Sequence, residues 1–559
     1  MKTKILFRGV IQALAIGALC AACTNLDVDV KSQYTKLPGG DQSLDAISGA
    51  IYAHTAPAGE GWFVANNNCS DVSVCVSLDG GWYDGGYFMR ETLHTWTPDG
   101  DAGHFGGMWD DAMGGVMACN RVLAQLDDPD GSDAASVRCM RAYFLYFLAD
   151  NFGAVPLVEK FGEAVDKRTP RPEVIKFCES ELLAVRDKLT TTVNATTYGK
   201  ATRYLADALL AKIYLNWAVY MTEDVTKYEP TMQNPKLNEC IAACDDIITS
   251  GNYNLSDDFI KKFMPDNGSN IKDFIFAIPF DHQLMQGNKI MRYWSYRNGH
   301  EMFSGITGWR YPSNPGGLMR MNTAYLDKFC LKGDRRNEAV LVGPQNLWSI
   351  DGYMTDEPFI KTVTKKEEDE LYTGADGDAM VNHRVNFTRE IKIREGLPNA
   401  IQQLNGGNDL IGREMGARSI KFFPDKNMTS SDSHNQSNDV PVFRLADILL
   451  MKAEAIMRGG KATNGDTPMS LFNQIRSYVN APLIEAAPTL DELLDERARE
   501  FLDEPWRRND LIRFGKWEAP TPFRTLYAPE CYTQKYRRLY PISQNILDTN
   551  PGWDQNPGY

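Results

Sequence analysis

The stretch RYLADALLAKIYLNWA, residues 203–218, decides the fold class of this chain. Between residues 201 and 220 the larger apolar side chains recur every three or four positions, so they fall on one face of a helix. That face holds Leu205, Ala208, Leu209, Lys212, Ile213 and Trp217. Small side chains at Ala206, Ala208 and Ala211 let a second helix approach closely. The pattern predicts stacked helix hairpins in the tetratricopeptide manner, although no regular repeat of that kind is readable.

The same spacing predicts a mainly α-helical scaffold over residues 43–251 and 442–517. The expected helices are 43–54, 107–126, 134–152, 172–190, 201–222, 237–249, 444–457, 470–479 and 489–502. Residues 252–441 lack long helical runs and are rich in glycine, proline and scattered aromatics. Such an irregular region on a helical scaffold often carries the binding surface. Residues 518–559 are expected to form an extended tail over the scaffold, since Pro541, Pro551 and Pro557 cannot lie inside a helix.

Composition limits the class of protein and its partners. The 559 residues include 43% hydrophobic side chains, enough for a large core, and no linker-like tract divides the chain after about residue 42. We therefore expect one globular unit over residues 43–559. The formal net charge of -14 argues against nucleic acid or another polyanion as the main partner and favours a neutral ligand.

The first residues have the pattern of a secretory signal. Basic residues precede an apolar run at residues 10–19, which is shorter than the roughly 20 residues needed to cross a bilayer. The run ends in Ala-Ala-Cys, so residues 1–22 are predicted to be a lipoprotein signal peptide cleaved before Cys23. Cys20 stands where such signals usually carry an aliphatic residue, and an ordinary signal peptide cleaved nearby is the alternative. Residues 23–42 would then be a lipidated tether.

The cysteines and acidic clusters predict neither a disulfide framework nor a cofactor. Nine cysteines follow Cys23, an odd number with no repeated spacing. Cys240 and Cys244 lie one helical turn apart in an amphipathic stretch and are expected to be buried core thiols rather than metal ligands. Residues 127–133 and 376–378 resemble fragments of calcium loops but lack the full series of ligands. No metal is therefore predicted.

Six segments at both ends of the chain form a signature that is hard to obtain by chance. They are MWDDAMGGVMACNRVL (108–123), RAYFLYFLADNFGAVPLV (141–158), RYLADALLAKIYLNWA (203–218), FRLADILLMKAEAIMR (443–458), ERAREFLDEPWRRNDLIRFGKW (496–517) and RRLYPISQNILDTNPGWDQNPGY (537–559). Together they resemble the SusD/RagB family of outer-membrane lipoproteins that capture glycans for import. Pro505 stands where the family usually has glycine, and Ser543 where a second proline is common.

The resemblance implies a fold, a location and a partner. The fold would be SusD-like, with tetratricopeptide-like helix pairs supporting an irregular, aromatic-bearing binding face. The acidic tract at residues 24–29 resembles a surface-export signal, so the chain would be anchored in the outer membrane through Cys23 and face the cell exterior. The partner would be a SusC-like TonB-dependent β-barrel, on which this protein sits as a lid. Transport energy would come from that partner.

The charged residues of 496–517 could be mistaken for a catalytic cluster. They are Glu496, Arg497, Arg507, Asp510 and Arg513. Acidic and basic side chains at helical spacing usually tie helices together, so a structural role is expected here. The same holds for Arg444, Asp447 and Glu454.

Two segments combine flat aromatics with planar polar groups, the mixture that sugar rings and hydroxyls require. In the first, residues 66–96, glycines flank the aromatics and let a ligand approach the backbone. The second runs over residues 292–311, and the family's glycan contacts tend to come from these two regions. The predicted ligand-binding residues are Asp71, Trp82, Tyr83, Arg90, Trp96, Trp294, Tyr296 and Trp309.

No motif indicates an enzyme. The chain has no GxSxG elbow, HExxH helix or P-loop, and its seven histidines show no ligand spacing. A glycoside hydrolase needs only two well-placed carboxylates, so a hydrolase stays a less favoured hypothesis among 73 acidic residues. The peptide-binding lid of a peptide importer is an alternative, whereas an adhesin would show the same anchor without the concentrated stacking aromatics. We predict a receptor that binds oligo- or polysaccharide without turnover.

Overall fold

The computed structural model describes residues 48–55, 60–100, 102–296, 302, 317–349, 351–427 and 434–559. The predicted signal peptide, the lipidation site Cys23, the tether and Trp309 lie outside these residues. Within the described ranges, no helix combines the length and the apolar composition that a membrane span requires.

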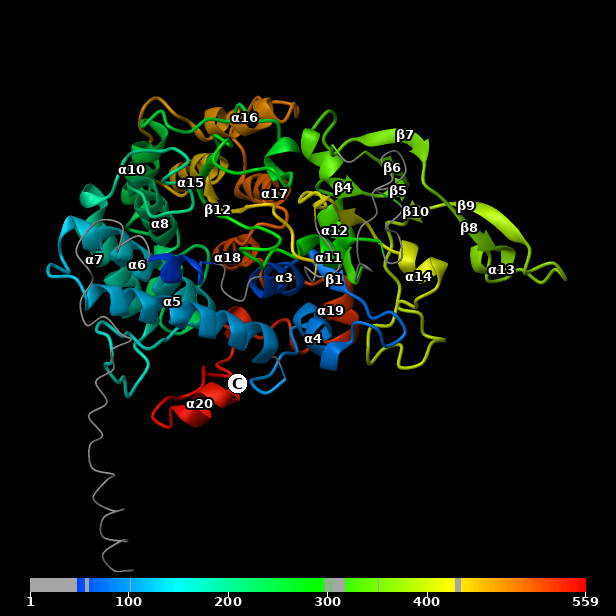
Figure 1. The fold of residues 1–559 in the computed structure, drawn as a ribbon, viewed down its shortest axis with the longest axis horizontal. Coiled ribbons are helices and arrows are strands. Elements are labelled where there is room, and N and C mark those ends of the chain that lie inside the picture. Colours follow the sequence, from blue (N-terminus) through cyan, green and yellow to red (C-terminus); the bar gives the residue numbers. More distant parts are fainter. Residues whose placement is uncertain are drawn as a thin grey trace, which may run out of the picture.

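The scaffold helices, including all the long ones, gather mostly in one half of the molecule (Figure 1). The first group is α3 (Glu60–Cys69), α4 (Tyr87–Leu93), α5 (Gly107–Leu123), α6 (Ser132–Phe152), α7 (Arg171–Val185), α8 (Arg203–Leu215), α9 (Trp217–Met221) and α10 (Leu237–Ile248). The second group is α15 (Leu445–Met457), α16 (Pro468–Tyr478), α17 (Leu490–Glu500) and α18 (Arg507–Arg513). Contacts run in series from α5 through α6, α7, α8, α10 and α15 to α16. This stacking of successive helices confirms the predicted mainly α-helical fold.

Small residues and one buried cation explain how the scaffold packs. A Cβ atom at Gly115 of α5 would lie 2.6 Å from the Phe144 ring of α6, so only glycine allows this approach. On α8, Lys212 lies on the predicted apolar face and is fully buried. Its ammonium group pairs with Asp447 at 2.8 Å and lies 4.5 Å from the centre of the Trp506 ring. The lysine therefore joins α8 to α15 rather than interrupting the core.

Short antiparallel strand pairs, which the sequence did not predict, lie mostly in the irregular region. The described strands are β1 (Ser73–Cys75), β2 (Phe274–Ile278), β3 (Met319–Met321), β4 (Val340–Leu341), β5 (Gly343–Pro344), β6 (Asn346–Trp348), β7 (Met354–Pro358), β8 (Ile360–Thr364), β9 (Met380–Arg384), β10 (Asn386–Phe387), β11 (Arg418–Ser419) and β12 (Val440–Arg444). They form six two-stranded sheets, and the hairpin of β8 and β9 projects from the body of the molecule (Figure 1).

The helices of this region are short, as expected. They are α11 (Ile290–Trp294), α12 (Thr323–Leu326), α13 (Lys365–Glu368) and α14 (Leu410–Glu414). In the described part of residues 252–441, none of these α-helices is longer than five residues.

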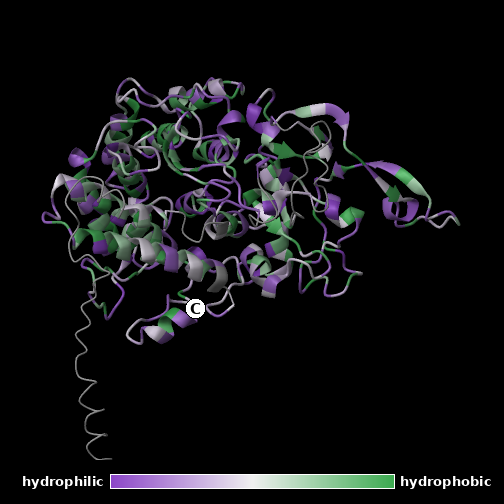
Figure 2. Cartoon of the chain, in the orientation of Figure 1, coloured by the Kyte–Doolittle hydropathy of each residue, from purple (hydrophilic) through white to green (hydrophobic). Residues whose placement is uncertain are grey.

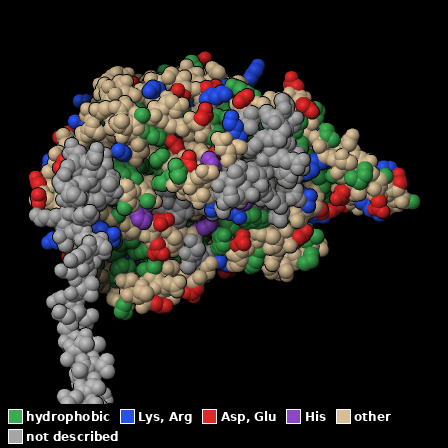
Figure 3. Space-filling view, viewed as in Figure 1, with side chains coloured by type: hydrophobic (Ala, Val, Ile, Leu, Met, Phe, Trp, Pro, Cys, Tyr) green, Lys and Arg blue, Asp and Glu red, His purple; other side chains and the backbone are tan. Residues whose placement is uncertain are grey.

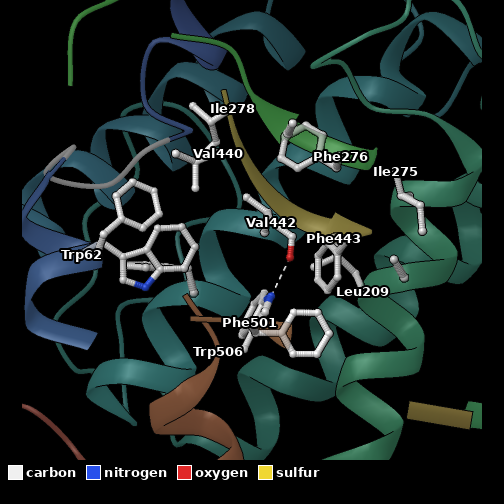
Figure 4. Close-up of a cluster of buried hydrophobic side chains, with 14 of the residues drawn as sticks. Trp62, Leu209, Ile275, Phe276, Ile278, Val440, Val442, Phe443, Phe501 and Trp506 are labelled. Carbon is white, nitrogen blue, oxygen red and sulfur yellow. Dashed lines mark hydrogen bonds between the residues drawn. The ribbon is translucent and has the colours of Figure 1, made fainter. Parts of the chain in front are cut away.

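The strand pair of β2 and β12 lies at the centre of the core (Figure 4). Both strands are buried along their whole length, and Val440 pairs with Ile278. Figure 4 shows Trp506 below the pair, with its indole nitrogen donating a hydrogen bond of 2.6 Å to the Val442 carbonyl oxygen. Coloured by hydropathy, both the helices around this centre and the projecting hairpin show apolar and polar residues side by side (Figure 2).

The charged cluster of α17 and α18 is buried and paired, which confirms its predicted structural role. Glu496, Arg497, Arg507, Asp510 and Arg513 are each at most 4% exposed. The Arg497 guanidinium contacts Asp447 at 2.8 Å and Asp510 at 2.7 Å. The Arg513 guanidinium contacts Glu454 and Asp510, both at 2.7 Å. Opposite charges thus tie α15, α17 and α18 together inside the core.

The C-terminal tail covers the scaffold but is less extended than predicted. It includes α19 (Pro522–Tyr527), a 3-10 turn η9 (Lys535–Arg538) and α20 (Gln544–Thr549). Side chains of its last residues bind distant backbone: Asn556 donates to the Phe152 carbonyl oxygen at 2.8 Å. The Tyr559 hydroxyl accepts a 2.6 Å hydrogen bond from the Trp96 indole nitrogen. The last residues of the chain are therefore hydrogen-bonded to the end of α6 and to the segment before α5.

Candidate ligand-binding site

The loop before α4 has an unusual backbone. Asp79, Trp82 and Asp84 have φ angles of 52°, 66° and 45°, in the left-handed region that non-glycine residues rarely adopt. Gly85 and Gly86 also have positive φ angles, of 69° and 87°. Strained conformations of this kind persist only where the surroundings fix them, and they cluster at functional sites. We call residues 77–90 the Trp82 loop.

Contacts with a distant segment fix the Trp82 loop. The Asp79 carboxylate accepts hydrogen bonds from the Asn408 backbone N–H at 3.0 Å and from the Asn405 amide at 3.3 Å. The Asp79 N–H donates to the Asn405 side-chain oxygen at 3.0 Å. Leu78 and Gly81 exchange backbone hydrogen bonds of 3.1 and 2.9 Å. The loop is therefore held in place before any ligand arrives.

Trp82 lies at the edge of the core, partly exposed. The Arg292 guanidinium carbon of α11 lies 4.6 Å from the centre of its ring, and the Tyr293 ring meets it edge-on at 6.2 Å. A cation over an indole face is attracted by the ring quadrupole and fixes the ring's orientation. The two predicted segments thus meet here, because Trp82 comes from the first and Arg292 from the second.

Tyr83 and Arg90 are also partly exposed and lie on the same loop. The Arg90 guanidinium donates to the carbonyl oxygens of Gly85, at 2.8 Å, and Gly100. A Cβ atom at Gly86 would lie 2.9 Å from the Tyr83 hydroxyl oxygen, so glycine is needed where the tyrosine folds back. The loop therefore presents an indole, a phenol and a guanidinium, which can stack on and hydrogen-bond a sugar.

Three other predicted residues are core residues in this structure. Trp96 and Trp294 have no exposed surface, and Tyr296 is 4% exposed. Trp294 donates its indole N–H to the Asp503 carboxylate at 2.9 Å, and the Tyr296 ring packs on Phe387. No ligand can stack on these rings in the conformation observed, so we leave them out of the site.

Asp71 has a structural partner. Its carboxylate accepts two hydrogen bonds from the Arg507 guanidinium of α18, at 2.7 and 2.6 Å. Burial opposes the charged form of Asp71, but the neighbouring Arg507 outweighs it and lowers the pKa of the carboxyl group. Asp71 also lines a cavity of about 350 Å³ with Asn322 and Lys328. It ties the segment between α3 and β1 to α18, and no residue of the Trp82 loop lines this cavity.

Arg292, which begins the second aromatic segment and contacts Trp82, was not among the predicted ligand-binding residues. The only sequence signal was a cation directly before an aromatic pair. Asn405 and Asn408 were also missed, because their role depends on contact with Asp79 more than 300 positions away.

On the face seen in Figure 3, acidic and basic side chains are interspersed, which suits a neutral ligand.

Outside the Trp82 loop, the acidic residues and cysteines that could suggest catalysis or metal binding are buried or paired with other side chains. Burial raises the pKa of Asp207 and of Asp439 to about 7, but both side chains are at most 5% exposed. Cys240 and Cys244 are buried, as predicted, and the cysteines of the described residues are free thiols. Among the described residues no group of three or more histidine, cysteine or acidic side chains is placed to hold a metal ion. In the calcium-loop fragment, Asp376 pairs with Lys365 at 2.5 Å.

Sequence comparison relates the chain to glycan-binding proteins. The family model of the SusD family matches residues 217–559. The starch-binding protein SusD of Bacteroides thetaiotaomicron is 26% identical over 453 residues, which cover 76% of this chain and 72% of SusD. The SusD-like protein P38 of Formosa agariphila is 33% identical over 134 residues, 22% of this chain and 25% of P38.

Solved structures agree in fold. A laminarin-binding SusD-like protein superposes with a TM-score of 0.66 at 19% identity, covering 93% of this chain and 100% of its own. The surface glycan-binding protein A from Bacteroides thetaiotaomicron, in complex with laminarihexaose, gives a TM-score of 0.63 at 17% identity, covering 92% of this chain and 99% of that one. At these identities the likeness establishes the fold.

Proposed function

Because this chain belongs to the SusD family, we propose that it is a cell-surface protein that binds an oligo- or polysaccharide and passes it to an outer-membrane transporter. The observation that carries the proposal for this chain is the Trp82 loop. A rigid, partly exposed tryptophan beside Tyr83 and Arg90 suits stacking on a sugar ring and hydrogen bonding to its hydroxyls. The charge of -14 and the mixed surface favour a neutral polymer.

The location and partner follow from the family. Cys23 would carry the lipid anchor, and the acidic tract after it would direct the protein to the outer face of the outer membrane. The transporter would be a SusC-like TonB-dependent barrel, closed by this protein as a lid. Two or more acyl chains give durable membrane binding, which a lid that opens and closes requires.

We propose binding without catalysis. SusD and the surface glycan-binding protein A named above are described as binding proteins. Asp207 and Asp439, whose raised pKa values would suit a general acid, are buried and tied to other structural groups. A peptide ligand is the second candidate, because the guanidinium of Arg90 and the ring of Trp82 could also bind an extended peptide.

The test is calorimetric titration of the chain from Thr24 onward, which retains every residue that the structure describes. Starch oligosaccharides, laminari-oligosaccharides and a peptide mixture are titrated separately, and release of reducing sugar is followed in the same samples. Saturable binding of a glycan without release supports the proposal. Release of sugar would make the protein a hydrolase, and binding of peptides alone would replace the glycan by a peptide.

A further inference from the structure

Arg292 of α11 is a cation beside Trp82 that has no acidic partner among the described residues. It is partly exposed, and its guanidinium carbon lies 4.6 Å from the centre of the Trp82 ring and 5.9 Å from that of the Tyr293 ring. In the part of the chain that the structure describes, no carboxylate forms an ion pair with this guanidinium and no acceptor takes a hydrogen bond from it. Its positive charge is therefore not neutralised by those residues.

The three guanidinium nitrogens of Arg292 differ in accessibility. Nε is buried and has no hydrogen-bond partner. The two terminal nitrogens also lack a partner among the described residues, but they are not buried, so a ligand can reach them. A guanidinium holds its terminal N–H groups in one plane, and this arrangement matches the two oxygens of a carboxylate. The accessible edge of Arg292 can therefore bind a carboxylate through two parallel hydrogen bonds.

Other partly exposed arginines of this protein are paired with acidic side chains. The chain has 73 acidic and 59 basic residues, so a cation usually has a carboxylate within reach. Arg138 contacts Asp130 at 2.6 Å, and Arg335 contacts Asp258 at 2.9 Å. Arg292 departs from this pattern at the edge of the candidate binding site. A carboxylate on the ligand would supply the missing partner.

The charges around Arg292 also favour an anionic group. Burial, with Arg292 and Lys289 nearby, lowers the pKa of His434 to about 4, which indicates that the fields of the two cations add at this point. Of the acidic residues in the Trp82 loop, Asp79 accepts hydrogen bonds from a distant segment. Asp84 is exposed and forms no ion pair with Arg292. The local field is therefore positive although the whole chain is acidic.

We propose that Arg292 binds a carboxylate on the glycan, so that the ligand is a largely neutral polysaccharide with isolated uronic acid units. The sugar ring would lie against Trp82, and its carboxylate would accept hydrogen bonds from the terminal nitrogens of Arg292. The acidic units must be sparse, because the net charge of -14 opposes a polyanion. The inference rests on the proposed glycan capture at the Trp82 loop and names the chemical class of the ligand.

The test compares disaccharides that differ at one carbon. Maltose, cellobiose and laminaribiose are titrated into the chain from Thr24 onward, each beside the form in which the C6 hydroxymethyl group of the non-reducing ring is a carboxylate. Binding is followed through the ¹⁵N-labelled indole resonance of Trp82, identified by its loss in Trp82→Phe. We expect at least one acidic disaccharide to bind about tenfold more tightly than its neutral counterpart, because charge-assisted hydrogen bonds are the stronger ones. If no acidic form binds more tightly, the inference is wrong.

Variants of Arg292 separate carboxylate binding from a purely structural role. Arg292→Gln should abolish the preference for the acidic form and change the affinity for the neutral form by at most about fivefold, through the lost contact with the Trp82 ring. Arg292→Lys keeps the charge without the planar fork and should keep part of the preference. If Arg292 only orients the ring, Arg292→Gln weakens both forms equally, and that result would overturn the inference. A preference that persists in Arg292→Gln would do so too.

Arg121 of α5 is the matched control. Its guanidinium carbon lies 5.3 Å from the centre of the Phe161 ring, and it lies outside the Trp82 loop. Arg121→Gln therefore removes one positive charge and one cation–π contact away from the site. The preference for the acidic disaccharide should be unchanged in this variant. An equal loss of preference in Arg121→Gln and Arg292→Gln would mean that net charge, and not a contact with Arg292, sets the preference.

This inference and the proposed function fail separately. Equal binding of the acidic and neutral forms, lost in Trp82→Ala, would overturn the carboxylate contact and leave glycan capture at the Trp82 loop intact. Trp82→Ala lacks the indole reporter, so its binding is measured by calorimetry. If the acidic form still binds Trp82→Ala with wild-type affinity and is lost only in Arg292→Gln, the carboxylate contact is supported and glycan capture at the Trp82 loop is overturned.

Discussion

Trp82 and Trp294 come from the two aromatic segments, and replacing each by alanine should affect different properties. Trp82→Ala should weaken ligand binding, whereas Trp294→Ala should lower the stability of the fold. Trp82 is partly exposed and its ring is held by Arg292 at 4.6 Å. Truncating an aromatic anchor in a binding site costs ~1–3 kcal/mol of binding free energy. Trp82→Ala should therefore raise the Kd for the glycan about 5- to 150-fold, since each 1.4 kcal/mol is about tenfold.

Trp294→Ala acts on stability instead. The ring has no exposed surface, and its N–H donates to the Asp503 carboxylate at 2.9 Å. Large-to-small changes of a buried tryptophan cost ~3–5 kcal/mol, from lost burial and the cavity left behind. Asp503 would also lose one of its donors and keep those of Asn67 and Ser419. We therefore expect Trp294→Ala to lower the free energy of unfolding.

Both variants are measured by urea unfolding and by calorimetric titration with the glycan that the wild-type chain binds. Trp294→Phe is the control, because it keeps most of the buried ring and removes only the N–H donor. Its unfolding free energy should lie between those of Trp294→Ala and the wild type. The reasoning fails if Trp82→Ala binds with unchanged affinity, or if Trp294→Ala stays as stable as the wild type and loses binding.

Three further changes probe the scaffold. Burial opposes ionisation of Glu500, but Arg444 and Arg336 outweigh it and lower the pKa of its carboxyl group to about 2. Because this folded-state pKa lies below the unfolded value, Glu500 stabilises the fold at neutral pH and loses that effect as pH falls from about 5 toward 2. Glu500→Gln should cost ~3–5 kcal/mol at pH 7 and flatten the acid limb of stability in urea unfolding; an unchanged limb would contradict this. Tyr559→Phe removes the acceptor of the Trp96 N–H and should cost ~1–3 kcal/mol, seen as a lower Tm, whereas Tyr353→Phe, 54% exposed, should leave Tm unchanged. Gly153→Ala would place a Cβ atom 2.5 Å from a Leu539 methyl carbon at φ 77°, while Gly162→Ala has φ 80° and open space; the first should lower Tm clearly more than the second.

The long helices could be predicted because their signal is local. The expected helix 134–152 is found as Ser132–Phe152, and 237–249 as Leu237–Ile248. The sequence did not reveal α3, Glu60–Cys69, because its run of three asparagines is poor in helix propensity. Those asparagines bind other segments: Asn67 donates to Asp503 at 2.6 Å and Asn68 to Glu91 at 3.0 Å. Tertiary contacts therefore support a helix that the local sequence does not favour.

The strand pairs were missed for a related reason. Strands β2 and β12 are buried on both faces, so they lack the alternation of polar and apolar residues that marks a half-exposed strand. Val440 pairs with Ile278, which lies far from it in the sequence, and a short apolar run does not indicate which distant strand it will pair with. The prediction of an irregular region correctly excluded long helices there, but it did not include the strand pairs.

The aromatic residues show why a binding site could be predicted only by region. Trp82 and Trp96 lie in the same segment with similar neighbours, yet the indole of Trp96 is buried against the hydroxyl of Tyr559, 463 positions away. Trp82 is partly exposed, in a loop whose backbone is left-handed at Asp79, Trp82 and Asp84.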